Sequence, residues 1–259
     1  METRDWRALC ALMEAAEREA AELMLHARGV LAETKSGRRD LVTDYDRRVQ
    51  QLLTERLREA APEARFFCEE TEKHGRADEG LVFIIDPIDG TMNFVYGFHH
   101  SCLSVACAED GVVRAGAVYN PYLDEMFTAV RGQGAFLNGR TIHVAEGPLS
   151  ENVVCFGTSP YNPAVTEQTF TLARRLFDAG LDLRREGSAA LDLCTVAAGR
   201  AGLFFELSLS LWDYAAGALL VQEAGGLCLS PDGSALPSGG GKSGVVAGSP
   251  ACVEAFWKL

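Results

Sequence analysis

The residues with the clearest chemical potential lie in the segment 86–91 (DPIDGT), directly after the apolar run 81–85. Asp86 and Asp89 would converge at the end of a strand, because the proline between them fixes the turn. Carboxylate and carbonyl oxygens are the ligands that Mg²⁺ prefers. The pattern therefore predicts a magnesium site, although an isolated pair of this kind more often caps a helix or ends a turn.

The next residues predict a phosphate site beside the metal. If residues 91–94 begin a helix, the backbone amides of Gly90 and Thr91 have no partner within it. Such amides, at the positive end of the helix dipole, bind phosphate oxygens. Metal and phosphate would then share one pocket.

The composition narrows the classes of partner. The chain has 259 residues, 47% hydrophobic and 23% charged, which is typical of a packed globular protein. Its formal net charge of -12 argues against non-specific binding to nucleic acid or to an anionic membrane surface. We expect neither partner, and we expect an acidic protein that handles phosphate to need cations.

The termini and the cysteines predict a cytoplasmic protein. The first 20 residues are charged and helical in pattern, unlike a signal peptide, and no apolar run reaches spanning length. The eight cysteines are scattered, with no CxxC pair, so we expect them to be reduced and mostly buried.

Hydrophobic periodicity predicts the elements that position these residues. Up to residue 149 we expect helices over 3–28 and 43–60, then strands over 64–68, 81–86, 101–109, 112–120 and 124–130. From 150 on we expect strands over 153–156, 181–185 and 202–206 and near 227 and 245, alternating with helices over 165–178, 188–198 and 212–223. This predicts an α+β half (1–149) with the main metal site and an α/β half (150–259) that completes the cleft.

One stretch invites a different interpretation. Residues 238–243 (SGGGKS) look like part of a phosphate-binding P-loop, but the pattern needs a glycine at position 236, which is leucine. We predict a flexible surface turn there.

Several segments together resemble the inositol-monophosphatase family. Residues 86–94 (DPIDGTMNF) resemble its first signature, and residues 212–217 (WDYAAG) with 223–226 (EAGG) resemble its second. Matching segments occur at Lys35 with 40–46, at 69–70, at 132–139 and at 187–190. Because order and spacing fit over nearly the full chain, the resemblance implies this family's sugar-phosphatase fold, a layered α-β-α-β-α sandwich.

The resemblance implies a site for two to three Mg²⁺ ions. The implied ligands are Glu69, Asp86, Asp89, Asp213 and the carbonyl of Ile88, with Asp40 at the outer ion. Four acidic side chains in one cleft would repel one another unless cations lay between them, so the set is consistent with metal. Glu70 is the competing candidate for the role of Glu69, and Asp213 could also be the N-cap of a helix.

The resemblance also implies catalytic and substrate contacts. Glu69 and Thr91 would orient the attacking water, Asp46 would hydrogen-bond near Thr91, and no covalent intermediate on the enzyme is required. The implied substrate contacts are Gly90 and Thr91 for phosphate, Ser188, Ala189 and Glu206 for ring hydroxyls, and Asp213 and Lys35 beside them.

Two departures from the family pattern concern the substrate end of the site. Residues 207–211 (LSLSL) lack the basic or imidazole side chain that relatives commonly place near Ser210, which puts the substrate's identity in doubt. The pair His99 and His100 suggests zinc, but neighbouring side chains in a strand point to opposite faces.

These observations predict a magnesium-dependent phosphomonoesterase for a small polyol or sugar monophosphate, with myo-inositol monophosphate first. The alternatives are a phosphatase for fructose 1,6-bisphosphate, histidinol phosphate or a 3'-phosphoadenosine nucleotide, and a non-catalytic binding or regulatory protein on the same fold. A second phosphate would need further basic residues, for which the candidates are Lys35, Arg184, Arg185 and Lys242. The resemblance also implies a homodimer and sensitivity to lithium.

Overall fold

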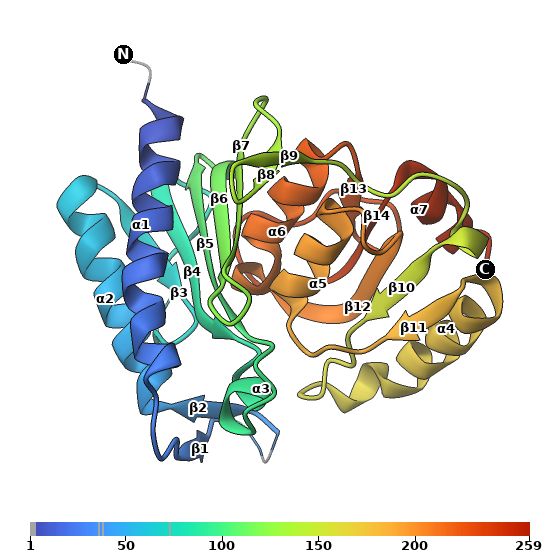
Figure 1. The fold of residues 1–259 in the computed structure, drawn as a ribbon, viewed down its shortest axis with the longest axis horizontal. Coiled ribbons are helices and arrows are strands. Elements are labelled where there is room, and N and C mark those ends of the chain that lie inside the picture. Colours follow the sequence, from blue (N-terminus) through green and yellow to red (C-terminus); the bar gives the residue numbers. More distant parts are fainter. Residues whose placement is uncertain (1–3, 36, 38, 73) are drawn as a thin grey trace.

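In the computed structural model, which describes residues 4–35, 37, 39–72 and 74–259, two helices cover one face of a large sheet (Figure 1). They are α1 (Trp6–Leu25) and α2 (Asp44–Ala60). The Asp5 side chain caps α1 by accepting hydrogen bonds from the amides of Arg7 and Ala8. The apolar faces of the two helices bury Met13, Val49 and Leu53 against the sheet.

The large sheet has seven strands in the order β3-β4-β5-β6-β7-β8-β9. β3 runs parallel to β4, and each further neighbour is antiparallel. All nine residues of β4 are buried, which explains its uninterrupted apolar run. The bounds are β3 (Arg65–Cys68), β4 (Leu81–Asp89), β5 (Cys102–Glu109), β6 (Val112–Asn120), β7 (Glu125–Val130), β8 (Ala135–Leu137) and β9 (Arg140–Ile142).

A second sheet has five strands in the order β11-β10-β12-β14-β13. β10 is parallel to β11 and β12, whereas β14 is antiparallel to β12 and β13. The bounds are β10 (Val153–Phe156), β11 (Asp182–Arg184), β12 (Leu203–Ser210), β13 (Leu227–Leu229) and β14 (Lys242–Gly248). The helices α4 (Thr166–Ala179) and α7 (Pro250–Phe256) lie on its outer side (Figure 1).

The helices α5 (Ala189–Ala197) and α6 (Leu211–Glu223) lie between the two sheets (Figure 1). Nearly all of their residues are buried, as expected for helices that are covered on both sides. α6 approaches β6 closely, since a Cβ atom on Gly116 would lie 3.2 Å from the Cα of Ala216. The layers therefore alternate α-β-α-β-α, which confirms the predicted fold class.

The sequence did not predict the smaller elements. These are the hairpin of β1 (Ala32–Thr34) and β2 (Leu41–Thr43), the strands β8 and β9, the helix α7, and the turns Leu149–Glu151 and Pro163–Val165. The short helix α3 (Thr91–Val95) begins where the sequence suggested. The glycine-rich segment 238–241 is largely exposed, as predicted, and leads directly into β14 at Lys242.

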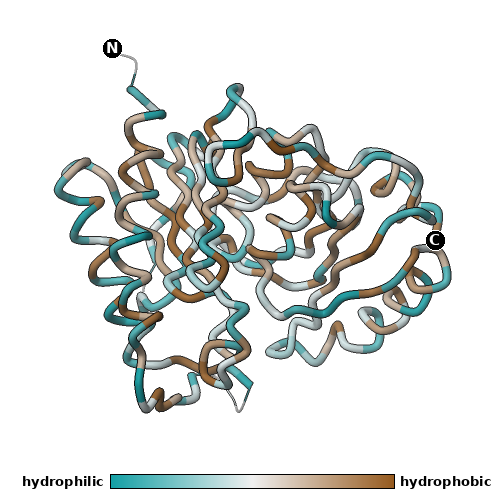
Figure 2. Tube along the Cα trace, viewed as in Figure 1, coloured by the Kyte–Doolittle hydropathy of each residue, from teal (hydrophilic) through white to brown (hydrophobic). Residues whose placement is uncertain are grey.

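Hydropathy follows the layers. Hydrophobic residues concentrate along the strands and on the inner faces of the helices, whereas the outer helix faces are hydrophilic (Figure 2). All eight cysteines are free and buried, as predicted. Among the described residues, none of the helices combines the length and apolar character needed to cross a membrane. The largest apolar cluster contains residues from both predicted halves, so the core is continuous across residue 150. The division at that residue stays a prediction.

Candidate metal and phosphate site

A pocket of about 530 Å³ lies where the end of β4, the starts of α5 and α6, and the β1–β2 hairpin meet. Most residues that the family resemblance implied lie on its wall, although they come from distant parts of the chain. They are Lys35, Asp40, Glu69, Asp86, Ile88, Asp89, Gly90, Thr91, Ala189, Glu206 and Asp213. Asp46 and Ser188 are not on the wall and instead contact residues that are.

The end of β4 presents the first two carboxylates. The pairing of β4 with β5 shifts register between Asp86 and Asp89, so the strand is irregular where the acids occur. The Ile88 amide donates to Asp86 Oδ1 at 3.1 Å, which fixes this turn. Gly90 follows with a φ of +87°, and a Cβ atom there would lie 3.0 Å from the His100 carbonyl oxygen, so the turn needs glycine.

Ser188 and the start of α5 hold Asp89. The Ser188 hydroxyl and the Ala190 amide both donate to Asp89 Oδ2, at 2.5 and 2.7 Å. Burial raises the pKa of Asp89 to about 6, and these two bonds oppose the rise. Ser188, predicted as a substrate contact, therefore positions Asp89 in this structure.

The remaining acids repel one another at close range. Burial is the main cause of the raised pKa of Asp86, and the negative charges of Glu69, Asp89 and Asp213 add to it. The pKa of Asp213 is raised by burial and then by Asp89 and Glu69. A cation between these groups would relieve the repulsion.

The donor set fits magnesium in its chemistry. It consists of carboxylates with the Ile88 carbonyl, and includes neither sulfur nor imidazole. Among the described residues, however, no group of three or more Asp, Glu, His or Cys is already spaced to hold an ion. The carboxylates would therefore have to draw together around the ion.

Lys35 provides a positive charge at the edge of the acidic cluster. Its Nζ lies 2.9 Å from Glu69 Oε1 and also contacts Glu70. Glu69 lines the pocket, whereas Glu70 does not. Burial raises the pKa of Glu70 to about 7. These positions agree with the choice of Glu69 over Glu70, although the role itself stays a prediction.

A capping box at the start of α2 supports Thr91. Asp46 Oδ2 accepts from the amide and the hydroxyl of Thr43, at 2.8 and 2.5 Å, which leaves Oδ1 facing Thr91. The Thr91 hydroxyl lies 3.3 Å from Asp46 Oδ1 and 3.1 Å from the Ile88 carbonyl. Asp46 is fully buried, and burial raises its pKa to about 6.

The far end of the pocket is built on β12. Glu206 Oε1 accepts from the amide and the hydroxyl of Ser159, at 2.7 and 3.1 Å. Burial raises the pKa of Glu206 to about 7. The side chain packs so closely that a Cβ atom on Gly157 would lie 1.8 Å from Glu206 Oε2. This end can accept hydrogen bonds from a hydroxylated group.

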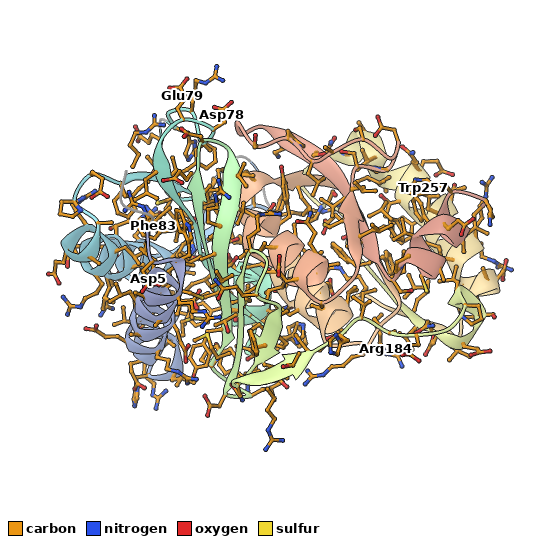
Figure 3. The ribbon with its side chains drawn as sticks, turned by 90° about the horizontal axis from the view of Figure 1, so that it is seen from above. Asp5, Asp78, Glu79, Phe83, Arg184 and Trp257 are labelled. Carbon is orange, nitrogen blue, oxygen red and sulfur yellow. The ribbon has the colours of Figure 1, made fainter. Side chains whose placement is uncertain are left out.

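Sequence reasoning missed several wall residues, notably Arg39, Tyr161 and Asp192. They occupy loops and a helix interior, where no local pattern marks a pocket. Of the four basic candidates for a second phosphate, Arg184 is not on the wall: it lies at the outer edge of the molecule and pairs with Asp182 (Figure 3).

The histidine pair gives no metal site in the part of the chain described. His99 stacks on Tyr122 with ring centroids 4.8 Å apart, and His100 Nε2 lies 3.1 Å from Glu186. The two histidines precede β5, so their separation does not come from strand alternation, which corrects the predicted reason.

Comparison with known proteins places the chain in a family. The model of the inositol monophosphatase family matches residues 6–258. "Inositol monophosphatase 2" of Solanum lycopersicum is 42% identical over 203 residues, which is 75% of this chain and 76% of that protein. "Nus factor SuhB" of Escherichia coli K12 is 36% identical over 224 residues, which is 86% of this chain and 83% of that protein.

Solved structures agree in fold. The extragenic suppressor protein SuhB from Bartonella henselae has a TM-score of 0.89 and 33% identity, and the match covers 97% of both chains. An IMPase/NADP phosphatase complexed with Mg²⁺ and phosphate has a TM-score of 0.82 and 27% identity, and the match covers 97% of this chain and 93% of that one. The family signatures, the layered fold and these matches agree: this chain belongs to the inositol monophosphatase family.

Proposed function

We propose that this protein is a Mg²⁺-dependent phosphomonoesterase that hydrolyses a small polyol or sugar monophosphate, with myo-inositol monophosphate as the first substrate to test. The observation that carries the proposal is the convergence of Glu69, Asp86, Asp89 and Asp213 on one pocket beside Gly90 and Thr91. Family membership supports a phosphatase of this superfamily.

The acids and the Ile88 carbonyl would hold two to three magnesium ions, with Asp40 at the outer position. The ions would supply positive charge to the phosphoryl group and to the leaving oxygen. We assign the phosphate contact at Gly90 and Thr91 to the family resemblance, because α3 is only five residues long.

The protein's own groups would position a water molecule for in-line attack on phosphorus. Glu69 and Thr91 would hold that water, and Glu69 would accept its proton as the P–O bond to the leaving group breaks. Asp46 would hold the Thr91 hydroxyl in place through its Oδ1. The departing oxygen would take up a proton from water, and Glu69 would return its proton to solvent. The products are then inorganic phosphate and the free alcohol, and no enzyme side chain is modified.

Glu206, with Ala189 and Ser188 nearby, would receive the leaving group. Glu206 is 7% exposed, lines the pocket and forms no ion pair among the described residues, so hydroxyl groups of a polyol would complete its hydrogen bonding. Asp213 and Lys35, on the same wall, would contact the substrate from the metal side.

A specific observation favours a second candidate, a phosphatase for fructose 1,6-bisphosphate, histidinol phosphate or a 3'-phosphoadenosine nucleotide. Arg39, Arg185 and Lys242 line the same pocket, and within the described residues none of the three takes part in an ion pair. These cations could bind a second phosphate. Compared with the four basic residues that the sequence suggested, the wall contains Arg39 and lacks Arg184.

The non-catalytic alternative rests on the relatives that are named Nus factor SuhB. A protein with that role would keep the fold without needing turnover. The acidic cluster argues for catalysis, because four clustered carboxylates without a bound metal or a function would only lower stability.

Phosphate release would test these candidates directly. The substrates are myo-inositol 1-phosphate, fructose 1,6-bisphosphate, histidinol phosphate and 3'-phosphoadenosine 5'-phosphate, each with Mg²⁺ and with EDTA. We expect release that needs Mg²⁺, is largest for myo-inositol 1-phosphate, and disappears in Asp89→Asn. Release that persists in EDTA would contradict the metal mechanism, and no release from any substrate would favour the non-catalytic alternative.

We further propose that the protein is a cytoplasmic homodimer and that lithium inhibits it by competing for a magnesium position, as the family resemblance implies. Sedimentation as a monomer at micromolar concentration would contradict the dimer. Full activity in millimolar lithium would contradict the competition.

A further inference from the structure

One buried acid on the pocket wall has no role in the function proposed above. Asp192 lies in the first turn of α5, is 2% exposed and lines the pocket. Its Oδ1 has no hydrogen-bond partner among the described residues. A buried carboxylate oxygen without a donor costs about 1–3 kcal/mol or more, so such an oxygen beside a pocket indicates a site that a ligand completes.

The surroundings of Asp192 place it at the leaving-group end. Glu206 and Glu186 are the negative charges that act on it most strongly, and Arg185 is the cation that opposes them. Arg185 also faces Glu206, and its guanidinium donates to the Thr158 hydroxyl at 3.2 Å. Asp192 and Glu206 therefore share one region of the pocket, away from the β4 turn.

A purely structural role would leave Asp192 Oδ1 without a hydrogen-bond donor. The first turn of α5 places Asp192 where the helix dipole favours a negative charge, but burial still raises the pKa of Asp192 well above its usual value. The Cys155 thiol interacts with Asp192, and the pKa of this thiol is raised by burial and then by the charge of Asp192. A thiol is only a weak donor, and neither feature supplies a partner for Oδ1.

We propose that Asp192 is a specificity-determining residue that accepts a hydrogen bond from a hydroxyl of the leaving group, next to the hydroxyl bound by Glu206. This inference rests on the proposed phosphatase function and narrows its substrate class to phosphate esters of alcohols with at least two hydroxyls within reach of both acids. A leaving group without hydroxyls would leave one carboxyl oxygen of Asp192 and one of Glu206 without a hydrogen bond. The enzyme would therefore disfavour such a substrate.

The test compares two substrates and two variants. We expect Asp192→Ala to lower kcat/KM for myo-inositol 1-phosphate more than for p-nitrophenyl phosphate, whose leaving group has no aliphatic hydroxyl. Because burial raises the pKa of Asp192 well above its usual value, we expect the effect of a hydrogen bond to a neutral group, and the ratio of the two values should fall by about twofold to tenfold. Asp192→Asn keeps an acceptor oxygen and should recover most of the ratio. Asp178→Asn, on the exposed face of α4, is the matched control.

Binding provides a readout that does not depend on turnover. In calorimetry with Mg²⁺, Asp192→Ala should weaken binding of myo-inositol 1-phosphate by a similar factor. An equal loss for both substrates, or unchanged binding, would overturn the assignment. A loss confined to histidinol phosphate would overturn it in favour of a cation-binding role. If the wild type binds the polyol phosphate but hydrolyses nothing, the phosphatase proposal fails while the binding result still decides the role of Asp192.

Discussion

At the scale of single residues, the candidate site separates side chains that face the pocket from side chains that hold them. Asp89 offers one oxygen to the pocket because Ser188 and Ala190 occupy the other. Thr91 is held in the same way by Asp46, which is itself fixed by Thr43. Such supporting contacts set the geometry that catalysis needs.

Ser188→Ala should weaken magnesium binding. The variant removes the 2.5 Å bond to Asp89 and leaves Oδ2 held by the Ala190 amide without the hydroxyl. The lost hydrogen bond to a charged group contributes about 1.5–3 kcal/mol. Its loss should raise the Mg²⁺ concentration for half-maximal activity by roughly tenfold or more.

The loss of the α5 cap should also lower the free energy of unfolding by about 1 kcal/mol, which urea unfolding in EDTA measures separately. Ser150→Ala, exposed in the turn Leu149–Glu151, is the control. An unchanged Mg²⁺ requirement in Ser188→Ala would contradict the positioning role.

Glu17, which does not line the pocket, should make the stability of the protein depend on pH. It is fully buried in α1, neither carboxyl oxygen has a partner among the described residues, and burial raises its pKa well above the usual value. The unfolded chain loses this proton near its ordinary pKa, whereas the folded protein keeps it to higher pH. Stability is therefore lost as pH rises above the unfolded value, by about 1.4 kcal/mol for each unit of pKa shift.

Glu17→Gln should remove that pH-dependent loss. In urea unfolding, the variant should exceed the wild type only slightly in free energy of unfolding at pH 5 and clearly at pH 8. Glu55→Gln, on the exposed face of α2, should show no such difference. An equal effect of Glu17→Gln at both pH values would show that the carboxyl is not protonated in the fold.

At the scale of elements, the site depends on one link between α3 and the segment before α5. The Asn93 amide nitrogen donates to the His100 carbonyl at 2.7 Å and to the Glu186 carbonyl at 2.8 Å. These bonds tie the end of the β4 turn to residues 187–188, which in turn hold Asp89. Asn93 thus joins the two halves of the pocket, together with the bonds from Ser188 and Ala190 to Asp89.

Asn93→Asp should break this link without changing the size of the side chain. An ionised carboxylate cannot donate, so it would face two carbonyl oxygens and leave both unpaired. We expect a loss of about 2–5 kcal/mol in the free energy of unfolding, at about 1–3 kcal/mol for each unpaired group, and a fall in kcat. Asn162→Asp, at an exposed turn, is the control. Wild-type stability and kcat in Asn93→Asp would contradict this role.

The helices and strands also show how much of the fold could be predicted from the sequence. Long apolar periods and caps predicted α1, α2, α4, α5 and α6 to within a few residues, and the apolar run 81–85 predicted the core of β4. The strands β8 and β9 have three residues each, too few for an alternation to be visible. Arg39, Tyr161 and Asp192 reach the pocket only because distant elements pack together, so no local pattern could place them there.

At the scale of the whole molecule, the pocket concentrates the negative charge of an acidic chain. The protein carries a net charge of -12, and the wall of the pocket contains seven acidic side chains against four basic ones, one of which already pairs with Glu69. The fold buries much of this charge between its two sheets and therefore holds it at a cost. Ions that bind the folded state alone would offset that cost.

Magnesium should therefore stabilise the whole protein. A ligand at 100 times its Kd adds about 2.7 kcal/mol to the free energy of unfolding, so saturating Mg²⁺ should raise the Tm by several degrees over EDTA. NaCl at equal ionic strength should not reproduce the shift, because it screens charge without coordinating oxygen.

Asp213→Asn removes one carboxylate and should reduce the shift in Tm, whereas Asp232→Asn at a surface turn should leave it intact. The shift should be larger at pH 8 than at pH 5, because burial raises the pKa of Asp89 to about 6 and protons then compete with the ion. A Tm that does not respond to Mg²⁺, or that responds equally in Asp213→Asn, would show that this acidic pocket does not bind the ion.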